Sequence, residues 1–502
     1  MPAAPPCNAR VALDEVLALR AEMAREGRET YGLWRDRIER HDFAASALNL
    51  AHYLALRRRD LRTLQRRLMP LGVTSLGRLE GRVLASLDAA AGALAAIADV
   101  ADRPFPGERR FFRGEARLAE NAVRALGPTT SGRSGRILVT LPSEAATDAT
   151  LIPALAARGA ELVRINCAHD GPAAWEAMIA HARAARTTAG APLRVLMDIA
   201  GPKVRTEAVV TPAERRRLYP GDVVRLGRTL VTANREVPFQ MTCSEPAVLD
   251  RLTVGTSVSI DDGSVEGAIT AAVEGGFLVR IGRCKASGVK LKAEKGLNFP
   301  NTDLGLDPLT DKDREDLDFI VRHADVIGYS FVQTAGHVAT LHAELARRTP
   351  GWRSIPLVGK IETPLAVRNL PEIIVEAAGR QPFAVMIARG DLAVEMGFER
   401  VAEMQEEILW LCEAAQVPVI WATQVLEGLV KDGMPSRGEM TDAAMSARAE
   451  CVMLNKGANV GLAVEVLDRL LRRMAGHQVK KTPTLRALHA WERNASAPAF
   501  ID

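Results

Sequence analysis

Three charged residues, Lys360, Glu362 and Asp391, have a spacing that suits chemistry on a phosphate. Lys360 and Glu362 are two residues apart in PLVGKIE, so on an extended strand their side chains point to the same face. Asp391 follows in ARGDL, and carboxylate oxygens are ligands that Mg²⁺ prefers. An ammonium beside a metal and a phosphate neutralises charge, which is the main requirement of phosphoryl transfer. A surface salt bridge explains Lys-x-Glu equally well by itself, so the interpretation depends on the elements that position these residues.

Beyond residue 132 the sequence alternates short apolar or β-branched runs with helical stretches, which predicts a parallel α/β architecture. Eight strands with helices between them predict a closed (β/α)₈ TIM barrel. The eight runs are ILVTL (137–141), ELVRI (161–165), RVLMDI (194–199), DVIGYSF (325–331), PLVGKI (356–361), FAVMIA (383–388), VPVIWA (417–422) and CVMLN (451–455).

Polar residues follow these runs, at the end where barrel enzymes place their catalytic groups. A polar residue at the end of one strand needs no function, because any strand that leaves a core must meet water. So many polar and charged residues at the same end of the barrel favour a functional site instead. Gly390 lets the chain turn sharply into a helix whose free N–H groups can bind a carboxylate, and Thr423 can add a hydroxyl. The polar residues are Arg164, Asn166, His169, Asp198, Lys203, Arg205, Ser330, Lys360, Glu362, Arg389, Asp391, Thr423, Gln424, Asn455 and Lys456.

The rest of the chain predicts attachments to this barrel. Residues 1–132 carry apolar residues at helical spacing and predict an all-α N-terminal extension that ends in a Gly, Ser and Pro-rich loop. Residues 207–296 contain hairpin patterns with Gly and Asp turns and predict an inserted small β-barrel lid domain. The barrel itself is then expected at 133–206 and 297–476, and residues 477–502 form a short tail.

Composition excludes several classes of protein. The hydrophobic fraction of 47% and charged fraction of 25% are those of a globular protein, and a net charge of +4 on 502 residues predicts no nucleic-acid partner. Neither a signal peptide nor an apolar run of about 20 residues occurs, so we expect a cytoplasmic protein that does not enter a membrane. The six cysteines lack CxxC spacing, which predicts neither a disulfide framework nor a zinc site. Only eleven lysines occur, none before Lys203, so an ammonium is expected to matter where one appears.

With these motifs the sequence resembles the pyruvate kinase family. The resemblance covers about residues 137–475 and includes, in the family's order, LVRINCAH, MDIAGPKVRT, SIDDG, EKGLNFP, SFVQ, GKIE, ARGDLAVE, VIWATQVLE, SRGEMTD and CVMLN. It implies transfer of the phosphoryl group of phosphoenolpyruvate to ADP, giving pyruvate and ATP in glycolysis. It also implies a need for Mg²⁺ or Mn²⁺ and a homo-oligomer.

The resemblance carries roles over to matching positions. Glu362 and Asp391 are implied to bind the divalent cation, and Lys360 to stabilise the transferring phosphoryl group. Thr423, with the backbone at Gly390 and Asp391, is implied to hold the carboxylate of phosphoenolpyruvate and to lie on the side from which the enolate is protonated. The remaining contacts implied are Arg164 and Arg205 on phosphates, Ser330 on the substrate, and Arg164, His169 and Asp262 near the nucleotide, with the inserted domain as a mobile lid.

Departures from the family pattern predict differences in behaviour. Ala168 replaces the usual Ser that ligates K⁺, while Asn166 and Asp198 remain as a remnant of that monovalent site. Lys203 replaces the usual Glu after the Gly-Pro pair, and its ammonium can supply the missing charge, so we expect activity without K⁺.

Further departures concern nucleotide contacts, proton delivery and regulation. TLPSEA replaces the pattern after the first strand, and Asn455, Lys456 and Gly457 replace the usual Ser-Gly-Glu, which leaves the proton donor to the enolate open. The family's C-terminal effector domain is not expected after the barrel, so regulation by that route is expected to be absent.

Two other functions stay open at this point. One is a magnesium-dependent aldolase or lyase that acts on pyruvate-like enolates on the same kind of barrel. The other is a catalytically weak relative with a regulatory role, whose helical extension binds a protein partner. The inserted lid favours the kinase over the aldolase, because a nucleotide needs a cover and a small aldol acceptor does not.

Overall fold

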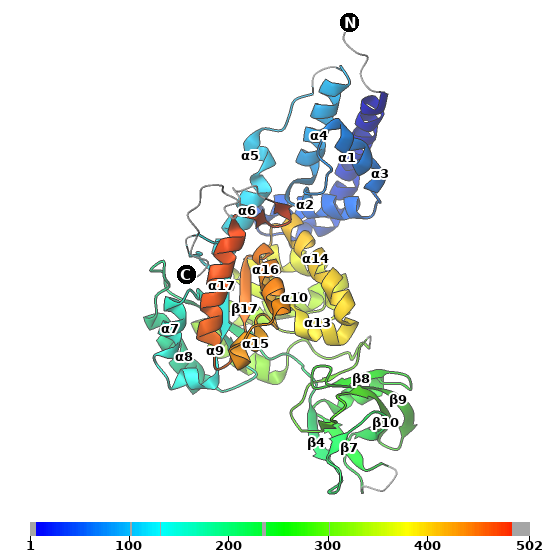
Figure 1. Cartoon of the computed structure of the whole chain (residues 1–502), viewed down its shortest axis with the longest axis vertical. Coiled ribbons are helices and arrows are strands. Elements are labelled where there is room, and N and C mark those ends of the chain that lie inside the picture. The colour runs from blue at the N-terminus through cyan, green and yellow to red at the C-terminus, as the bar shows by residue number, and fades with distance from the viewer. Residues whose placement is uncertain (1–6, 101–102, 131, 233–236, 301, 484–502) are drawn as a thin grey trace, which may run out of the picture.

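A computed structural model describes residues 7–100, 103–130, 132–232, 237–300 and 302–483. Three bodies follow one another along the long axis in Figure 1: a helical bundle, a central α/β body and a β domain. The predicted tail lies mostly outside the described residues, which end after a short hairpin of β18 (Gln478–Val479) and β19 (Thr482–Pro483).

The central body is a closed eight-stranded parallel barrel, as predicted. All eight runs form strands whose ends lie within two residues of the predicted ones, and the order around the barrel is β1-β17-β16-β15-β14-β13-β3-β2. The strands are β1 (Arg136–Thr140), β2 (Leu162–Asn166), β3 (Arg194–Ile199), β13 (Val326–Tyr329), β14 (Leu357–Ile361), β15 (Phe383–Ala388), β16 (Val419–Ala422) and β17 (Cys451–Leu454).

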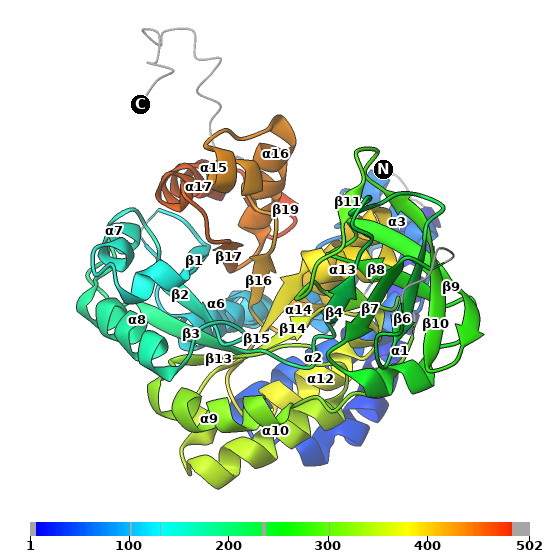
Figure 2. The ribbon, with the colours of Figure 1, turned by 90° about the horizontal axis from the view of Figure 1, so that it is seen from below.

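Helices surround this barrel because each strand is buried on both faces and needs cover on the outside. Figure 2, seen along the long axis from the side of the β domain, shows the strands enclosed by helices. The surrounding helices are α7 (Leu151–Ala157), α8 (Pro172–Ala184), α9 (Asp311–His323), α10 (Ala335–Arg348), α11 (Pro364–Arg368), α12 (Leu370–Ala378), α13 (Arg389–Met396), α14 (Phe398–Ala414), α15 (Glu427–Asp432), α16 (Arg437–Met445) and α17 (Val460–Ala475).

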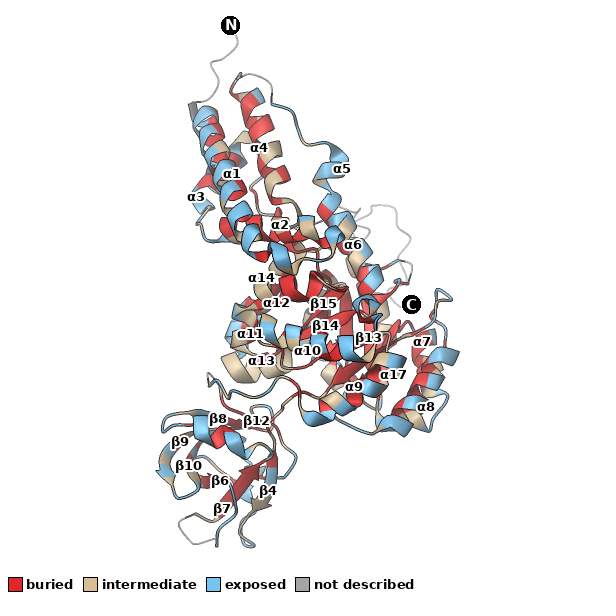
Figure 3. Cartoon of the chain, turned by 180° about the vertical axis from the view of Figure 1, so that it is seen from behind, coloured by how far each residue is buried: buried red, intermediate tan, exposed pale blue. Residues whose placement is uncertain are grey.

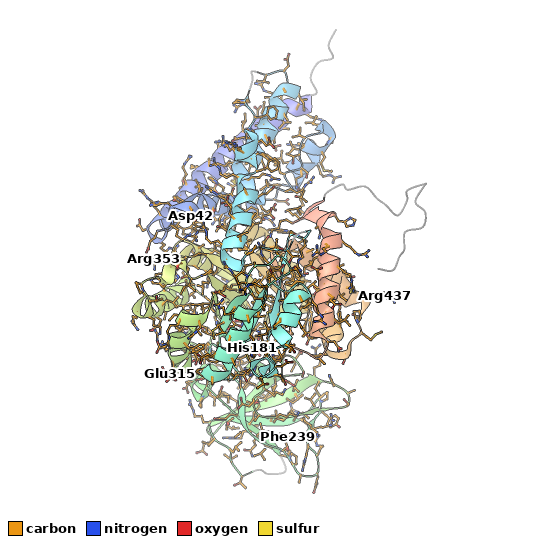
Figure 4. All side chains as sticks on the ribbon, turned by 90° about the vertical axis from the view of Figure 1, so that its left-hand side faces the viewer. Asp42, His181, Phe239, Glu315, Arg353 and Arg437 are labelled. Atoms are coloured by element: carbon orange, nitrogen blue, oxygen red, sulfur yellow. The ribbon has the colours of Figure 1, made fainter. Side chains whose placement is uncertain are left out.

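The inserted domain, called the lid below, has a core of its own. Its main sheet has seven strands in the order β12-β8-β9-β10-β6-β7-β4, and Phe239 is fully buried in it (Figure 4). The strands are β4 (Thr206–Val210), β6 (Val223–Gly227), β7 (Phe239–Cys243), β8 (Ser257–Ile260), β9 (Val265–Val273), β10 (Gly276–Cys284) and β12 (Leu297–Asn298), with β5 (Arg217–Leu218) and β11 (Val289–Lys290) paired separately. The lid enters after β3 and returns before α9, so it hangs from the carboxyl end of the barrel.

The N-terminal extension is helical, as predicted, and packs on the opposite end of the barrel (Figure 3). Its helices are α1 (Cys7–Trp34), α2 (His41–Arg57), α3 (Arg62–Leu68), α4 (Val83–Ile97), α5 (Glu108–Phe111) and α6 (Arg113–Leu126). The backbone N–H groups of Glu39 and Arg40 donate to Gly379 O at 2.9 and 2.8 Å. Arg353 reaches Glu39 at 2.7 Å close to Asp42, and Figure 4 shows Asp42 and Arg353 at this junction.

Helix α6 closes the bottom of the barrel. Ala125 and Leu126 are fully buried in the same apolar cluster as the side chains that fill the barrel interior, including Leu138 and Met453. Arg136 donates to Gly127 O at 2.8 Å, which fixes the turn that leads from α6 into β1. The extension therefore completes the barrel core rather than resting on its surface.

No helix within the described residues is both long and apolar enough to cross a membrane.

Truncating the α6 side chain inside the barrel should destabilise the protein. We expect Leu126→Ala to lower the free energy of unfolding by about 2–5 kcal/mol, because it leaves a cavity in a core that cannot collapse around it. Val123→Ala, on the exposed face of the same helix, should change it by less than about 0.5 kcal/mol. Urea denaturation followed by circular dichroism measures the two values, and equal effects of the two substitutions would contradict the role given to Leu126.

Candidate active site

A chain of buried charges crosses the carboxyl ends of four neighbouring strands. Asp198, at the end of β3, is completely buried, and its Oδ2 accepts a hydrogen bond from Arg164 Nε at 2.9 Å. The same oxygen lies 3.2 Å from Lys360 Nζ, whose ammonium is also 3.1 Å from Glu362 Oε1. Lys360 Nζ also donates a hydrogen bond to Ser330 Oγ at 2.8 Å. The structure thus brings together five of the predicted residues, from β2, β3, β13 and β14.

Mutual pairing keeps Lys360 and Asp198 ionised despite their burial. Burial lowers the pKa of Lys360, but Asp198 and Glu362 outweigh it and leave the pKa above its usual value. Burial likewise raises the pKa of Asp198, and Lys360 and Arg164 reverse this to leave it below its usual value. The pKa of Glu362 is raised, first by burial and then by the nearby charge of Asp391, with Lys360 opposing. The ammonium of Lys360 is therefore a fixed charge at the barrel mouth.

Asp391 lies at the start of α13, directly after β15, and contacts a lysine from the segment between β3 and β4 that leads into the lid. Lys203 Nζ is 2.8 Å from Asp391 Oδ1 and 3.6 Å from Asp262 Oδ1 on the lid. Gly296 permits this approach, because a Cβ there would lie 3.1 Å from Lys203 Cε. Burial lowers the pKa of Lys203, but Asp391 and Asp262 outweigh it and raise the pKa above its usual value.

The remnant monovalent residues have partners other than Lys203. Asp198 is bound by Arg164 and Lys360, as described above, and Asn166 Oδ1 accepts from the N–H of Ala168 at 3.2 Å. The ammonium of Lys203 forms an ion pair with Asp391.

Thr423 sits on a strained turn after β16. Its φ is +66°, and Gln424 and Leu426 follow at +56° and +49°, a conformation that side-chain-bearing residues rarely adopt. Thr423 Oγ accepts from Gly390 N–H at 2.7 Å, which joins this turn to the start of α13. Such strain is typical of functional segments that the surrounding structure holds in place.

Arg389 is the group that holds this turn, and sequence reasoning did not assign it this role. It donates to Ala422 O at 3.0 Å and to Thr423 O at 2.6 Å, forms a two-pronged ion pair with Asp442 of α16, and lies over the Trp421 ring at 4.6 Å. Asp442 is 53 residues from Arg389, so no local pattern could have paired them.

The other predicted residues lie at the rim. Arg205 donates its backbone N–H to Ser244 Oγ at 3.0 Å and its guanidinium to Glu294 O at 3.4 Å. His169 is exposed, and its pKa is lowered by partial burial and by the charges of Lys456 and Arg205. Asn455, which replaces the family's Ser, donates to Glu427 at 3.1 Å. Asp262 is exposed on the lid turn that faces Lys203.

The donors at Glu362 and Asp391 fit a divalent cation. Burial raises the pKa of Glu362 and the nearby charge of Asp391 adds to the rise, so a cation between the two carboxylates would relieve their repulsion. No group of three or more His, Cys, Asp or Glu side chains placed to hold a metal occurs in the described part of the chain. An ion held by two carboxylates would keep positions open for substrate oxygens and water, which is how Mg²⁺ is usually bound.

A cavity of 580 Å³ lies between the barrel and the lid. It is lined by Phe331 and Thr363 of the barrel, by Lys203 between β3 and the lid, and by Asn298 and Glu395, which are bonded to each other at 2.9 Å. The cavity borders the charged cluster through Lys203, which contacts Asp391, and Phe331, whose N–H donates to Glu362.

Comparison with known proteins bears on what this arrangement does. Residues 132–462 match the family model described as "Pyruvate kinase, barrel domain". A pyruvate kinase of Encephalitozoon cuniculi is 34% identical over 61% of this chain and 66% of its own length, and one of Agrobacterium vitis is 31% identical over 69% and 70%. The chain spans about two thirds of the length of these relatives.

One solved structure is similar to this chain in its fold. A crystal structure of a pyruvate kinase from Cryptosporidium parvum superposes with a TM-score of 0.59 at 24% sequence identity, covering 70% of this chain and 72% of that one.

Proposed function

Because the chain belongs to the pyruvate kinase family, we propose that it transfers the phosphoryl group of phosphoenolpyruvate to ADP, giving pyruvate and ATP. The observation that carries the proposal is the buried ammonium of Lys360, held between Asp198 and Glu362 beside Asp391. It provides a fixed positive charge next to a pair of carboxylates suited to a divalent cation. We further propose that this is the pyruvate-forming step of glycolysis, carried out in the cytoplasm by a homo-oligomer.

Glu362 and Asp391 would hold Mg²⁺ or Mn²⁺, which when bound neutralises phosphate charge and orients substrate oxygens. The Lys360 ammonium would stabilise the phosphoryl group as it moves from the enol oxygen to the β-phosphate of ADP, because that group carries dispersed negative charge in transit. Arg164 would meet the same phosphate from the neighbouring strand, and Ser330 keeps the ammonium oriented. This step leaves the enolate of pyruvate.

The carboxylate of the substrate would lie at the N-terminus of α13. Gly390 N–H now donates to Thr423 Oγ, and the Thr423 hydroxyl donates in turn to Ala422 O at 2.7 Å, so a bound carboxylate would take over the N–H of Gly390. The Thr423 hydroxyl would then lie beside the substrate and serve on the path of the proton that completes pyruvate. Arg389 and Asp442 act as positioning residues here, since they hold the turn that carries Thr423.

Nucleotide contacts would come from the rim and the lid. Arg205 and His169 lie on the rim near Lys456, and Asp262 faces the site from the lid through Lys203. Closure of the lid over ADP would exclude water, which otherwise competes with ADP as phosphoryl acceptor.

The reaction itself is the first test. The purified full chain, mixed with phosphoenolpyruvate, ADP and Mg²⁺, should form pyruvate and ATP together, and Lys360→Met should lower kcat by about a thousandfold or more, because the phosphoryl group loses its nearest fixed charge. Lys290→Met, an exposed lysine on the lid, should leave the rate unchanged. Absence of pyruvate from the wild type would refute the proposal. Pyruvate released from a hydroxylated oxo acid without ADP would indicate the aldolase instead.

We also propose that turnover does not need K⁺, because the Lys203 ammonium supplies a permanent charge at Asp391. Replacing KCl by tetramethylammonium chloride at constant ionic strength should change the wild-type rate by less than about twofold. Lys203→Glu should be slow without K⁺ and recover about tenfold or more when KCl is added, since the missing cation can then be bound from solution. A strong K⁺ requirement of the wild type would contradict this assignment.

A further inference from the structure

The ammonium of Lys203 lies between carboxylates that belong to two different parts of the molecule. Its Nζ is 2.8 Å from Asp391 Oδ1 at the start of α13 and 3.6 Å from Asp262 Oδ1 on the lid. The side chains of Lys203 and Asp391 are 22% and 19% exposed, whereas that of Asp262 is 69% exposed. The lysine is therefore bound on the barrel side, with a second carboxylate close to the same ammonium.

The backbone is fixed on both sides of Lys203. Gly201, which has a φ of +70°, donates its N–H to Asp313 Oδ1 of α9 at 3.2 Å. On the lid side, Val204 O accepts from Leu297 N–H at 2.9 Å. The lysine side chain is a flexible four-carbon stem that ends in a compact charge. Lys203 can therefore change its partner by rotation of the side chain, without movement of the backbone that carries it.

A second contact joins the lid to the same helix. Asn298 of β12 donates through Nδ2 to Glu395 Oε1 at 2.9 Å. Glu395 follows Asp391 by four residues on α13, so the two carboxylates lie on one face of the helix, a turn apart. The lid and the segment that leads into it are thus joined to α13 at two points, and one of these points is the ion pair of Lys203.

Asp391 is also one of the two carboxylates that we propose for the divalent cation, together with Glu362. The oxygen that accepts from Lys203 cannot at the same time be a ligand of a metal ion, because the ammonium occupies the space in front of it. Two cations at contact distance of one oxygen also repel each other, and the repulsion is strong where water is partly excluded. Lys203 and a divalent cation therefore exclude each other at Asp391 Oδ1.

We propose that Lys203 is an intramolecular competitor of the divalent cation for Asp391, and that it turns to Asp262 on the lid when the ion binds. The inference rests on the metal site of the proposed function. It adds that binding of the ion exchanges a contact between Lys203 and α13 for a contact with the lid. Because such linkage is reciprocal, a change that draws Lys203 to Asp262 also tightens binding of the ion. The positive charge stays beside the site with either partner, as the proposed independence from K⁺ requires.

Titration of the full chain with Mn²⁺ at constant ionic strength, followed by electron paramagnetic resonance of the free ion, tests the competition. Lys203→Met and Lys203→Gln remove the ammonium and should bind Mn²⁺ about tenfold more tightly than the wild type, because an ion pair formed in about nine tenths of the molecules weakens the ion by that factor. Lys295→Met is the matched control. It removes a neighbouring lysine that pairs with Asp261 of the lid at 2.9 Å, and it should change the affinity by less than about twofold.

Asp262→Asn separates the exchange of partners from a general effect of charge. In the otherwise wild-type chain it should weaken Mn²⁺ by about threefold or more, since the ammonium loses its second partner and stays on Asp391. In Lys203→Met the same substitution should have no effect. Equal weakening in both backgrounds would mean that Asp262 attracts the ion directly, and would overturn the exchange.

The same titrations separate this inference from the proposed function. A wild type that binds Mn²⁺ with the same affinity as Lys203→Met and Lys203→Gln would refute the competition and leave the metal site in place. A wild type and lysine variants that all fail to bind Mn²⁺ would refute the metal site of the proposed function, and this inference with it.

Discussion

The pairing of the Lys360 ammonium with two buried carboxylates constrains the whole barrel mouth. Removing an ion from water costs several kcal/mol, so each of these groups can stay charged only while its partners remain within contact distance. Asp198 lies on β3 and Lys360 on β14, the strands on either side of β13, and Glu362 directly follows β14. The four strands must therefore keep their register, so that these side chains stay within hydrogen-bonding distance of one another. The packing of the barrel thus fixes the positions of the charges at its mouth.

The rest of the architecture keeps that register and places the lid beside it. Helix α6 fills the barrel from below with Leu126, so the extension contributes to the core that fixes the strands. Above the mouth, Lys203 links Asp391 to Asp262, so the lid is joined electrostatically to a carboxylate of the site. The strained turn at Thr423 is held by Arg389, whose own position depends on Asp442. Each reactive position is thus fixed by a residue from another element.

The barrel could be predicted because its signals are local. Each strand is a short apolar or β-branched run, and the polar residues at its end, such as Asp198 and Glu362, are read directly from the sequence. The pairings could not be predicted in the same way. Lys203 was expected to supply the charge of the missing monovalent cation, but its partner could not be read from the sequence: its ammonium pairs with Asp391, while Asn166 is bound by Ala168 N–H and Asp198 by Arg164 and Lys360. The pairing of Arg389 with Asp442 depends on how α16 packs, which no local pattern encodes.

The central claim is that Glu362 and Asp391 form one divalent-cation site beside the Lys360 ammonium. Binding of Mn²⁺ to the protein, followed by electron paramagnetic resonance of the free ion, measures this without any turnover. We expect one site whose affinity falls by about tenfold or more in Asp391→Asn and in Glu362→Gln, because each substitution removes a ligand charge. Glu399→Gln, exposed on α14, should bind Mn²⁺ as the wild type does. Wild-type affinity in the Asp391→Asn protein would contradict the account.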